Sequence, residues 1–503
     1  MDTLQSYDEL PYDSLPLPET QPDFLAALAR LHGFDAPDPT CARILELGCA
    51  SGGNLIPLAW RWPASQCVGI ELSRVQAEAG AEFIRALGLS NVRIVHGDLA
   101  ALSADLGEFD YIIAHGVFSW VPPAVQEALL ELCRRHLAPR GIAYISFNVA
   151  AGWRSLEPLR AALLARTGAD QPAPARYEAA LRVLDELEAQ WTDPALLKEI
   201  AYLRTAAPSY LFHEYLAEFN APLEFGRFDA ALAAHALRYV GEAGPRHAVV
   251  EFDDGGEADA RRRAERWRDA EAALDAALAT RFRRALIARA DAPADPHPAR
   301  ADALRELAFY ADLRCDEEID LEQATEQAFL NPAGNTFRVA PPVMKAALMV
   351  LSARYPAALT YADLQAAAGS VMVDCGVVAE VDDGAFRTAL FQLVMAHAVM
   401  PTPSAGPVVI DPGSHPRANA LARLQARSPG WVVSGRRHVA IDLDAAGRAL
   451  LALLDGNRAL PELSAAMQAW LAAAGVDLPE AAVNELTARQ LWLFARQGLL
   501  EET

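Results

Sequence analysis

Short apolar runs alternate with helical segments over residues 43–148. Runs typical of buried parallel strands lie at residues 43–48, 67–71, 92–95, 109–116 and 141–148. After the second run, Ser73 is a suitable N-cap for a helix that Gly88 ends, and Pro122 and Pro123 begin another helix before the fifth run. These repeated strand–helix units predict an α/β fold, with a parallel sheet covered by helices on both faces.

The pattern changes after the fifth run. Residues 153–205 are rich in Ala, Leu and Arg and predict helices without a strand. The segments "ALRYVGEA" (236–243) and "RHAVVEF" (246–252) predict a last pair of strands, which would complete the same sheet after the helical insertion. Residues 253–330 again predict helices.

The C-terminal part is predicted to be mostly helical. The stretch "NPAGNTFRVAPP" (331–342) contains Pro and Gly and predicts a linker. Helical segments on both sides of a Pro-rich loop near residues 401–416 indicate winged-helix-like modules. The predicted domains are a core at 1–152, a helical insertion and candidate dimerisation region at 153–221, the last strands of the core at 222–255, a helical regulatory region at 256–330, a winged-helix-like middle domain at 331–410 and a mostly helical C-terminal domain at 411–503.

The composition fits a chain of several globular domains. It has 503 residues, of which 52% are hydrophobic and 22% charged, and at about 100–200 residues per domain this length predicts roughly three or four domains. The formal net charge is −22. This acidic charge argues against nucleic acid or anionic membrane as a partner and favours basic proteins or neutral small molecules.

The cysteines and the N-terminus indicate a cellular location. The six cysteines contain no CxxC pair, so we expect free thiols in a reducing compartment. The acidic, polar N-terminus is unlike a signal peptide, and no run of 18 apolar residues predicts a membrane span. We therefore expect a cytoplasmic protein, and the frequent Ala and Arg are typical of a GC-rich bacterial genome.

The stretch "LELGCASGGN" (45–54) follows the first predicted strand and carries the first candidate chemistry. It does not fit the dinucleotide fingerprint, because Cys49 is followed by Ala50 where the second Gly is required. Its glycines let a ligand approach the backbone, and the following helix start offers N–H groups to a carboxylate. Glu46 can receive an ammonium group, so a ligand with amino-acid and nucleoside ends would fit; an ordinary tight turn is the alternative.

Two more acids follow the next two strands. Glu71 ends the second strand, where a carboxylate can accept both hydroxyls of a ribose. Asp98 follows the third strand and can accept from an adenine amino group, while the backbone of Leu99 meets the ring edge. All three acids fall at the carboxyl edge of the sheet, where open α/β folds bind their ligands.

These successive motifs resemble those of class I S-adenosylmethionine-dependent methyltransferases. The chain resembles most a bacterial family with a methyltransferase regulatory domain, which includes lysine methyltransferases of outer-membrane proteins. The shared segments are "YDELPY" (7–12), "LELGCASGGNLIPLA" (45–59), "HGVFSWVP" (115–122), "FNVAAGW" (147–153) and "SYLFHEYLAEFNAPLEF" (209–225).

The resemblance implies a Rossmann-like class I methyltransferase sheet and S-adenosylmethionine as cofactor, with S-adenosylhomocysteine as product. Tyr7 and Tyr12 are expected to fold over the cofactor as a lid. The implied cofactor-binding residues are Tyr7, Glu46, Gly48, Cys49, Gly52, Asn54, Glu71, Leu72, Asp98, Leu99, His115, Gly116 and Phe118.

The acceptor side departs from the family pattern. Where the family has Tyr-Asn-x-x-Pro-Gly-Trp, this chain has Phe147 and Ala151 in place of the Tyr and the Pro. Aromatic residues after the fourth and fifth strands could receive a cationic amine, or could simply belong to the core; they are Phe118, Trp120, Phe147 and Trp153. The implied catalytic residues are His115, Trp120, Asn148 and Trp153.

One further motif carries no chemistry of its own. "HEYL" (213–216) is not a metalloprotease motif, because residue 217 is Ala where the second His is required, so His213 and Glu214 are expected to be structural or part of a lid. No group of His and Cys has the spacing of a metal site.

The expected reaction is methylation of a protein lysine. The alternatives are a small-molecule N- or O-methyltransferase, a cofactor-binding scaffold that Phe147 has made inactive, and a nicotinamide-dependent oxidoreductase, which the missing glycine disfavours. The expected partners are a protein substrate and a second copy of the chain in a homodimer. Nucleic acid is not expected as a partner.

Overall fold

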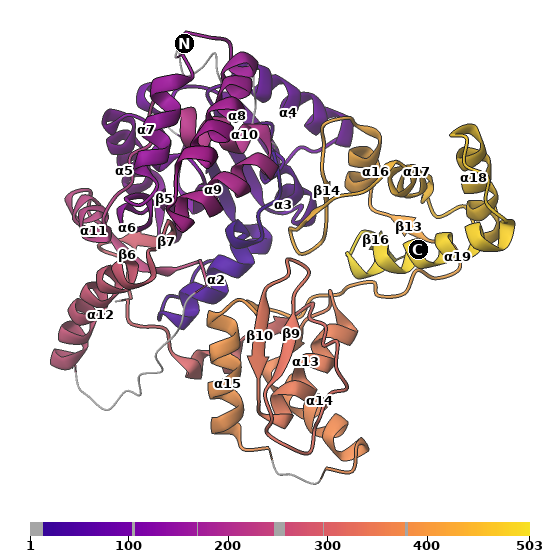
Figure 1. Ribbon diagram of the computed structural model, residues 1–503. Helices are drawn as coiled ribbons and strands as arrows, with labels where there is room; N and C mark the ends of the chain where they lie inside the picture. Colours follow the sequence, from indigo (N-terminus) through magenta and orange to yellow (C-terminus); the bar gives the residue numbers. More distant parts are fainter. Residues whose placement is uncertain are drawn as a thin grey trace. The chain divides into compact units, whose positions relative to one another are not determined.

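The computed structural model describes residues 14–102, 106–168, 170–245, 257–294, 296–377 and 381–502, without the side chains of residues 257–266. The chain forms two compact units, and each is described by itself (Figure 1). The first unit contains Met1–Ser14, Thr40–Ala243 and Asp254–His297. The second contains Leu15–Pro39, Gly244–Asp253 and Pro298–Thr503. The predicted strand pair member at 246–252 and the predicted lid residues Tyr7 and Tyr12 lie outside the described residues.

A seven-stranded, mostly parallel sheet is the centre of the first unit, as the sequence predicts. Its strand order is β3-β2-β1-β4-β5-β7-β6. The first five strands in this order pair in parallel, whereas β7 is antiparallel to both β5 and β6. The strands are β1 Arg43–Leu47, β2 Gln66–Glu71, β3 Val92–His96, β4 Phe109–Ala114, β5 Leu137–Asn148, β6 Leu237–Glu242 and β7 Phe282–Arg289.

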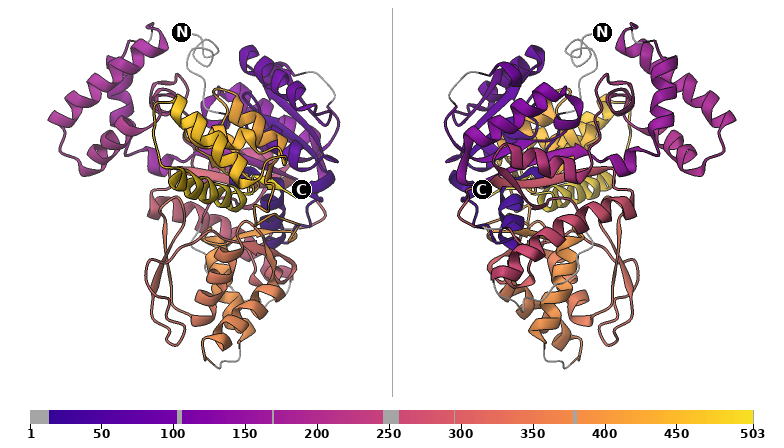
Figure 2. Two further views of the ribbon diagram at one scale, coloured as in Figure 1. Left: turned by 90° about the vertical axis from the view of Figure 1, so that its right-hand side faces the viewer. Right: turned by 90° about the vertical axis from the view of Figure 1, so that its left-hand side faces the viewer.

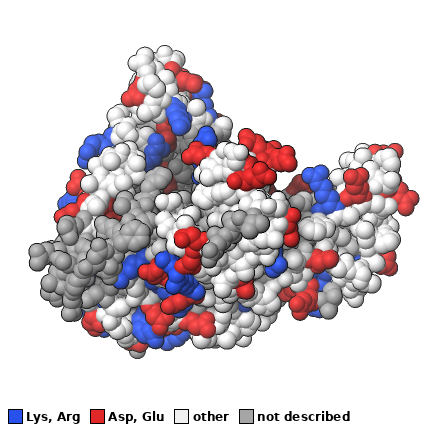
Figure 3. All heavy atoms as spheres, turned by 90° about the horizontal axis from the view of Figure 1, so that it is seen from below, with Lys and Arg blue, Asp and Glu red and all other residues white. Residues whose placement is uncertain are grey.

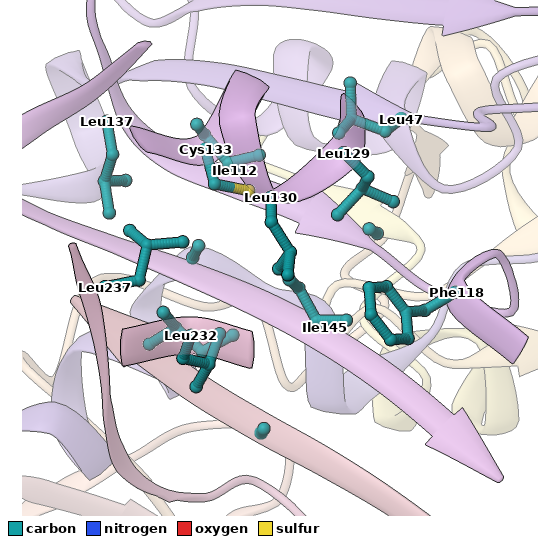
Figure 4. Packing of buried hydrophobic residues seen from close by; sticks show 14 of the residues in the cluster. Leu47, Ile112, Phe118, Leu129, Leu130, Cys133, Leu137, Ile145, Leu232 and Leu237 are labelled. Carbon is teal, nitrogen blue, oxygen red and sulfur yellow. The ribbon is translucent and has the colours of Figure 1, made fainter. Parts of the chain in front are cut away.

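Helices cover the sheet because consecutive strand residues, which point to opposite faces, are mostly apolar. Leu47, Ile112 and Ile145 pack on one face against Leu129 and Leu130 (Figure 4). These leucines belong to α5, and α11 covers the same cluster, so burial of apolar area holds this layer to the sheet. The helices of the core are η2 Pro39–Cys41, α3 Leu55–Arg61, α4 Arg74–Leu87, η3 Leu99–Ala101, η4 Phe118–Trp120, α5 Pro123–His136, α11 Phe225–Ala234 and α12 Glu257–Leu278.

The prediction of only helices at 253–330 is wrong, because β7 lies within that range. It is inserted between β5 and β6 and completes the sheet. Within β7, the side chain of Arg283 is fully buried. The Arg283 guanidinium donates to Asp275 at 2.8 Å and to Glu242 at 3.2 Å. Only these tertiary partners make a buried arginine in a strand acceptable, since an unpaired buried charge is very costly.

The insertion after β5 is helical, as predicted, and has its own apolar core. In the two views of Figure 2 its helices form an arm that extends from the sheet. The segment Phe212–Leu216 is a π-helix, a rare element that is frequent at functional sites. The helices are α6 Ala150–Trp153, α7 Glu157–Arg166, α8 Ala173–Gln190, α9 Pro194–Thr205, α10 Pro208–Leu211 and η5 Phe212–Leu216.

The second unit begins with a helix that precedes the sheet in sequence. In α2, Phe24 makes a T-shaped ring contact with His397, with centroids 5.2 Å apart. Sequence patterns placed this helix with residues 1–152, because periodicity identifies a helix but not its packing partner. The N-terminal and middle elements of this unit are η1 Pro18–Thr20, α2 Pro22–Leu31, η6 Ala301–Glu306, β8 Ala308–Tyr310, β9 Gln327–Leu330, β10 Thr336–Val339, α13 Pro342–Arg354, β11 Leu359–Thr360, α14 Tyr361–Asp374, α15 Asp383–Met395 and β12 Met400–Thr402.

The stretch 331–342 is not a linker. It contains the turn and second strand of an antiparallel hairpin between β9 and β10. Gly334, with φ +83°, forms the turn that the Pro/Gly content suggested as an interdomain connection. The C-terminal elements are β13 Arg417–Ala418, α16 Ala420–Arg427, β14 Val433–Ser434, β15 Ala440–Ile441, α17 Ala445–Leu453, α18 Leu460–Ala473, α19 Glu480–Arg496 and β16 Leu500–Glu501.

Candidate functional site

The loop after β1 crosses the carboxyl edge of the sheet next to the loop after β4. Gly48 has φ +72°, and a Cβ atom there would lie 2.7 Å from Cγ2 of Val117. The Gly48 N–H donates to the carbonyl of Ile70 at 2.8 Å, which ties the loop to β2. Glycine suits position 48 for two reasons: the backbone is left-handed there, and the two loops approach too closely for a side chain.

Glu46 lies under this loop and is buried. Its Oε1 accepts a hydrogen bond from Asn54 Nδ2 at 2.8 Å, whereas its Oε2 is buried without a partner among the described residues. Burial raises the pKa of Glu46 to about 8, against the hydrogen bond from Asn54, and the charge of Glu71 adds to the rise. An incoming ammonium group would satisfy the unpartnered oxygen, so this site fits the amino-acid end of a ligand.

Glu71 connects two loops at the same edge. Its Oε2 accepts from the Ala50 N–H and its Oε1 from the Ser73 N–H, both at 2.8 Å. Burial raises the pKa of Glu71, while these backbone hydrogen bonds lower it. Each carboxylate oxygen can accept a second hydrogen bond, so the predicted ribose grip is compatible with this geometry.

Asp98 and Leu99 follow β3 along the edge. The exposed Asp98 carboxylate accepts from the Ala100 N–H at 2.9 Å and caps the short helix that Leu99 begins. The Leu72 side chain is 41% exposed after β2. These residues lie at the β3 end of the carboxyl edge. There Leu72 and Leu99 could contact a flat apolar ring, and the Asp98 carboxylate could accept a hydrogen bond from its amino group.

Two predicted cofactor contacts are turned away or occupied. The Cys49 side chain packs on Gly69 of β2, since a Cβ at Gly69 would lie 2.4 Å from Cys49 Sγ. The expectation of free N–H groups at the helix start fails for Gly53, whose N–H donates to Ser14 Oγ at 2.7 Å. Gly52 (φ +83°) allows the turn but has a buried Cα. The backbone N–H groups of Cys49, Ala50 and Gly52 also have acceptors within the protein, so internal hydrogen bonds fix the shape of this loop.

His115 and Gly116 follow β4, beside β5. His115 Nδ1 lies 2.9 Å from the Tyr144 hydroxyl, and the Gly116 N–H donates to Ser146 Oγ at 2.8 Å. Tyr144 and Ser146 were not predicted as site residues. Tyr144, Ser146 and Asn148 are spaced by two residues along β5 and so lie on one face of the strand. This spacing could have identified Tyr144 and Ser146 from the sequence.

Phe118 and Phe147 are core residues. Phe147 stacks on Phe228 with centroids 4.2 Å apart, and Phe118 contacts the same ring edge-on at 5.5 Å. Figure 4 shows Phe118 directed into the cluster beside Leu130 and Ile145. The structure therefore does not bring these two aromatic side chains to the site edge. Alternation along β5 places Phe147 on the opposite face from Ser146 and Asn148, and Phe118, from η4, packs into the same cluster.

Trp120 and Trp153 do come together with Asn148. The two indole rings meet edge-on with centroids 6.5 Å apart. The Asn148 N–H donates to Ser119 Oγ at 2.8 Å, and its side-chain amide contacts Asn220 Oδ1 at 3.0 Å. The loops after β4 and β5 and the segment before α11 thus form one acceptor-side cluster, of which Ser119 and Asn220 were missed.

His213 and Glu214 lie in the π-helix. His213 is buried, and its ring contacts Phe212 at 5.3 Å. No group of His, Cys, Asp and Glu that could hold a metal ion occurs among the described residues. No helix in the described part of the chain is long and apolar enough to cross a membrane.

Three family models match this chain. They are a methyltransferase domain at residues 44–141, a predicted methyltransferase regulatory domain at 207–289 and "PKMT, C-terminal winged helix domain" at 414–492. The second model covers the π-helix, α11, β6 and β7, whereas the sequence patterns placed a regulatory region at 256–330.

Relatives extend the similarity. An uncharacterized protein of Rickettsia prowazekii is 40% identical over 243 residues, which are 47% of this chain and 44% of that protein. A second uncharacterized Rickettsia prowazekii protein is 35% identical over 229 residues, or 44% of this chain and 92% of that protein. The solved structure of PKMT2 from Rickettsia typhi in complex with AdoHcy has the same fold, with a TM-score of 0.82 and 22% identity over 97% of this chain and 100% of the other.

The matched methyltransferase domain contains the strands whose ends carry Glu46, Glu71 and Asp98. The geometry of Glu46, Glu71 and the Gly48 turn fits a ligand with amino-acid and nucleoside ends. The chain belongs to the class I S-adenosylmethionine-dependent methyltransferases that carry a methyltransferase regulatory domain.

Proposed function

We propose that this protein transfers the methyl group of S-adenosylmethionine to the ε-amine of a lysine in a protein substrate. The observation that carries the proposal is the match of residues 414–492 to the winged-helix domain of PKMT, the protein lysine methyltransferases, in a chain that also has the methyltransferase domain. The fold shared with PKMT2 of Rickettsia typhi over 97% of this chain supports it.

We assign the cofactor side to the edge of β1, β2 and β3. Glu46 would receive the ammonium group of the cofactor on Oε2, and Glu71 its ribose hydroxyls. Asp98 and Leu99 would contact the adenine ring. Bound there, S-adenosylmethionine supplies a sulfonium-activated methyl group, whose departure leaves the electron pair of the broken C–S bond on sulfur as a neutral thioether.

The protein residues of the acceptor side have three tasks in this reaction. They must desolvate the lysine amine, receive its proton before attack and align its lone pair with the methyl carbon. Trp120 and Trp153 are the proposed aromatic contacts of a cationic amine; each is 7% exposed, and Trp153 also packs in the apolar core of the insertion. His115, fixed by the hydrogen bond between its Nδ1 and Tyr144, is the proposed group at the boundary between cofactor and acceptor.

The test combines binding with mass spectrometry. Calorimetry should show S-adenosylhomocysteine binding to the wild type and strongly weakened binding to Glu71→Ala. The wild type is then incubated with S-adenosylmethionine and a bacterial envelope extract, which contains the outer-membrane proteins that the family resemblance suggests. Methylated lysines that appear only with active protein support the proposal. Binding without any protein methylation would instead favour a small-molecule acceptor, and no binding would remove the enzyme hypothesis.

The finer properties of partner and location belong to the same proposal. The acidic net charge of −22 supports a basic, lysine-bearing protein as substrate rather than a nucleic acid. We also propose a cytoplasmic location, on the strength of six cysteines that contain no CxxC pair. A homodimer through the helical insertion stays a prediction, which the mass of the protein in solution would test.

A further inference from the structure

The "HEYL" motif, set aside as a metalloprotease signal, places Tyr215 in the π-helix where it is buried. The Tyr215 hydroxyl donates to Glu199 Oε1 at 2.6 Å. The other oxygen of Glu199 accepts from Arg281 Nη1, also at 2.6 Å. These three residues, here named the insertion clamp, come from η5, from α9 and from the segment before β7, so they join the helical insertion to the sheet.

The insertion clamp touches the acceptor-side cluster directly. The Tyr215 ring lies against Trp153, with centroids 5.6 Å apart and planes tilted by 42°. Trp153 in turn meets Trp120 edge-on. Tyr215, at 1% exposed, is therefore the most deeply buried member of an aromatic row in which Trp153 and Trp120 are each 7% exposed. Trp120 follows Ser119, whose Oγ accepts from the Asn148 N–H, so the row ends at the carboxyl ends of β4 and β5.

Hydrogen bonds from two arginines hold the C-terminal end of the π-helix in place. Two arginines donate to consecutive carbonyls at the end of the π-helix: Arg176 to Leu216, at 3.0 Å, and Arg160 to Ala217, at 2.6 Å. A π-helix inserts an extra residue and so rotates the side chains that follow it. The geometry of the π-helix therefore sets the direction of the Tyr215 side chain.

Tyr215 does not suit a role as base. Burial and the hydrogen bond to Glu199 both raise the pKa of Tyr215, so its hydroxyl stays protonated. What the ring and the fixed hydroxyl supply instead is a rigid, amphipathic surface behind Trp153.

We propose that Tyr215 is a positioning residue for the acceptor lysine: held by Glu199 and Arg281, it fixes Trp153, and through it Trp120, as the aromatic wall along which the lysine side chain enters. The inference rests on the proposed lysine methylation and deepens it. An aliphatic stem with a cationic end fits such a wall, since the stem packs on the ring faces while the ammonium is attracted to them.

The experiment compares Tyr215→Phe with the wild type and with a matched control, Tyr202→Phe. Tyr202 is an exposed tyrosine of α9, with a ring contact to Tyr210 rather than to Trp153. The probe is a synthetic peptide around the lysine that the wild type methylates in the envelope extract. We measure KM for this peptide, kcat, the Kd of S-adenosylhomocysteine and Tm.

For Tyr215→Phe we expect KM for the peptide to rise about tenfold with kcat nearly unchanged, the pattern of lost binding shared by ground and transition state. The Kd of S-adenosylhomocysteine and the constants of Tyr202→Phe should stay at wild-type values. Glu199→Gln, whose amide oxygen can still accept from Tyr215, should raise KM less than Tyr215→Phe does.

Two results would overturn the inference while leaving lysine methylation intact. One is a wild-type KM in Tyr215→Phe. The other is a joint loss of Tm, cofactor affinity and turnover, which would mean that Tyr215 only holds the fold. A wild type that methylates no lysine in the extract would overturn the proposed function itself, and this inference with it.

Discussion

In the proposed cofactor site, Glu46 would couple cofactor binding to pH. Its carboxyl is buried, with Oε2 unpartnered among the described residues, and burial raises its pKa from 4.5 to about 8. Near neutral pH the ligand-free protein therefore holds a neutral Glu46. Receiving an ammonium group requires the charged form, so ligand binding must expel a proton.

We predict that binding of S-adenosylhomocysteine releases a proton at neutral pH, and that its affinity rises up to about tenfold per pH unit below pH 8. Calorimetric titration in two buffers with different ionisation enthalpies measures this release. Glu46→Gln should abolish the release and weaken binding. Identical binding enthalpies in both buffers for the wild type would contradict the prediction.

The same group affects the stability of the ligand-free protein. Because the folded pKa lies above the unfolded value, the folded chain keeps a proton that the unfolded chain loses between pH 4.5 and about 8. The contribution of Glu46 to stability is thus full below pH 4.5 and is lost as pH rises to about 8, with a slope of up to about 1.4 kcal/mol per pH unit. Glu46→Gln should flatten this part of the pH profile of unfolding.

Phe147 is the second residue whose role depends on its surroundings. Sequence comparison made it a candidate for lost activity, but its ring is 1% exposed and stacked on Phe228. A hydroxyl added there enters an apolar cluster. We predict that Phe147→Tyr lowers the free energy of unfolding by about 1–3 kcal/mol and does not raise turnover. Denaturant unfolding and a methylation assay check this; a gain in turnover would revive the scaffold hypothesis.

At the scale of elements, the short helix α6 is clamped against the segment before β7. The Gly152 N–H donates to the Thr280 carbonyl at 3.0 Å. A Cβ at Gly152 would lie 2.5 Å from the Ala279 carbonyl oxygen and 2.7 Å from that of Thr280. These are backbone atoms, which cannot move aside without displacing the strand.

We predict that Gly152→Ala destabilises the protein by about 1–3 kcal/mol and weakens acceptor turnover more than cofactor binding. Gly226→Ala in α11 is the matched control, because a Cβ there meets nothing within 4 Å. That substitution should be neutral or stabilising by up to about 1 kcal/mol. Equal unfolding curves for the two variants would show that the contact between Gly152 and the segment before β7 tolerates the extra carbon.

At the scale of the whole molecule, charge is the property that concerns the substrate. The chain carries a net charge of −22. On the face shown in Figure 3, the described acidic and basic side chains are interspersed. The excess of acidic groups over the whole sequence favours encounters with basic proteins.

We predict that KM for a lysine-bearing protein substrate rises with salt, while the Kd of S-adenosylhomocysteine changes little between about 0.05 and 0.3 M ionic strength, because exposed charges are screened and the buried cofactor contacts are not. Steady-state kinetics across this range measures the effect. A KM independent of salt would mean that the acidic charge does not guide the acceptor.

Much of this protein could be predicted from its sequence. The strand period and the acids at strand ends identify the parallel sheet, its binding edge and the motifs around Glu46, Glu71 and Asp98, because these features are local and repeat with fixed spacing. The family resemblance, carried by the same motifs, agrees with the domains that the comparisons find at 44–141 and 207–289.

Long-range contacts decided the rest. The packing on Phe228 shows that Phe147 is a core residue, and the ion pairs with Asp275, Glu242 and Glu271 explain how Arg283 can be buried in a strand. Likewise, the proposed role of Tyr215 depends on its hydrogen bond to Glu199, 16 residues earlier, and on the bond of Glu199 to Arg281, 66 residues after Tyr215. Sequence patterns report which face a residue occupies within its element; which elements meet, and hence which buried polar groups find partners, depends on the tertiary structure.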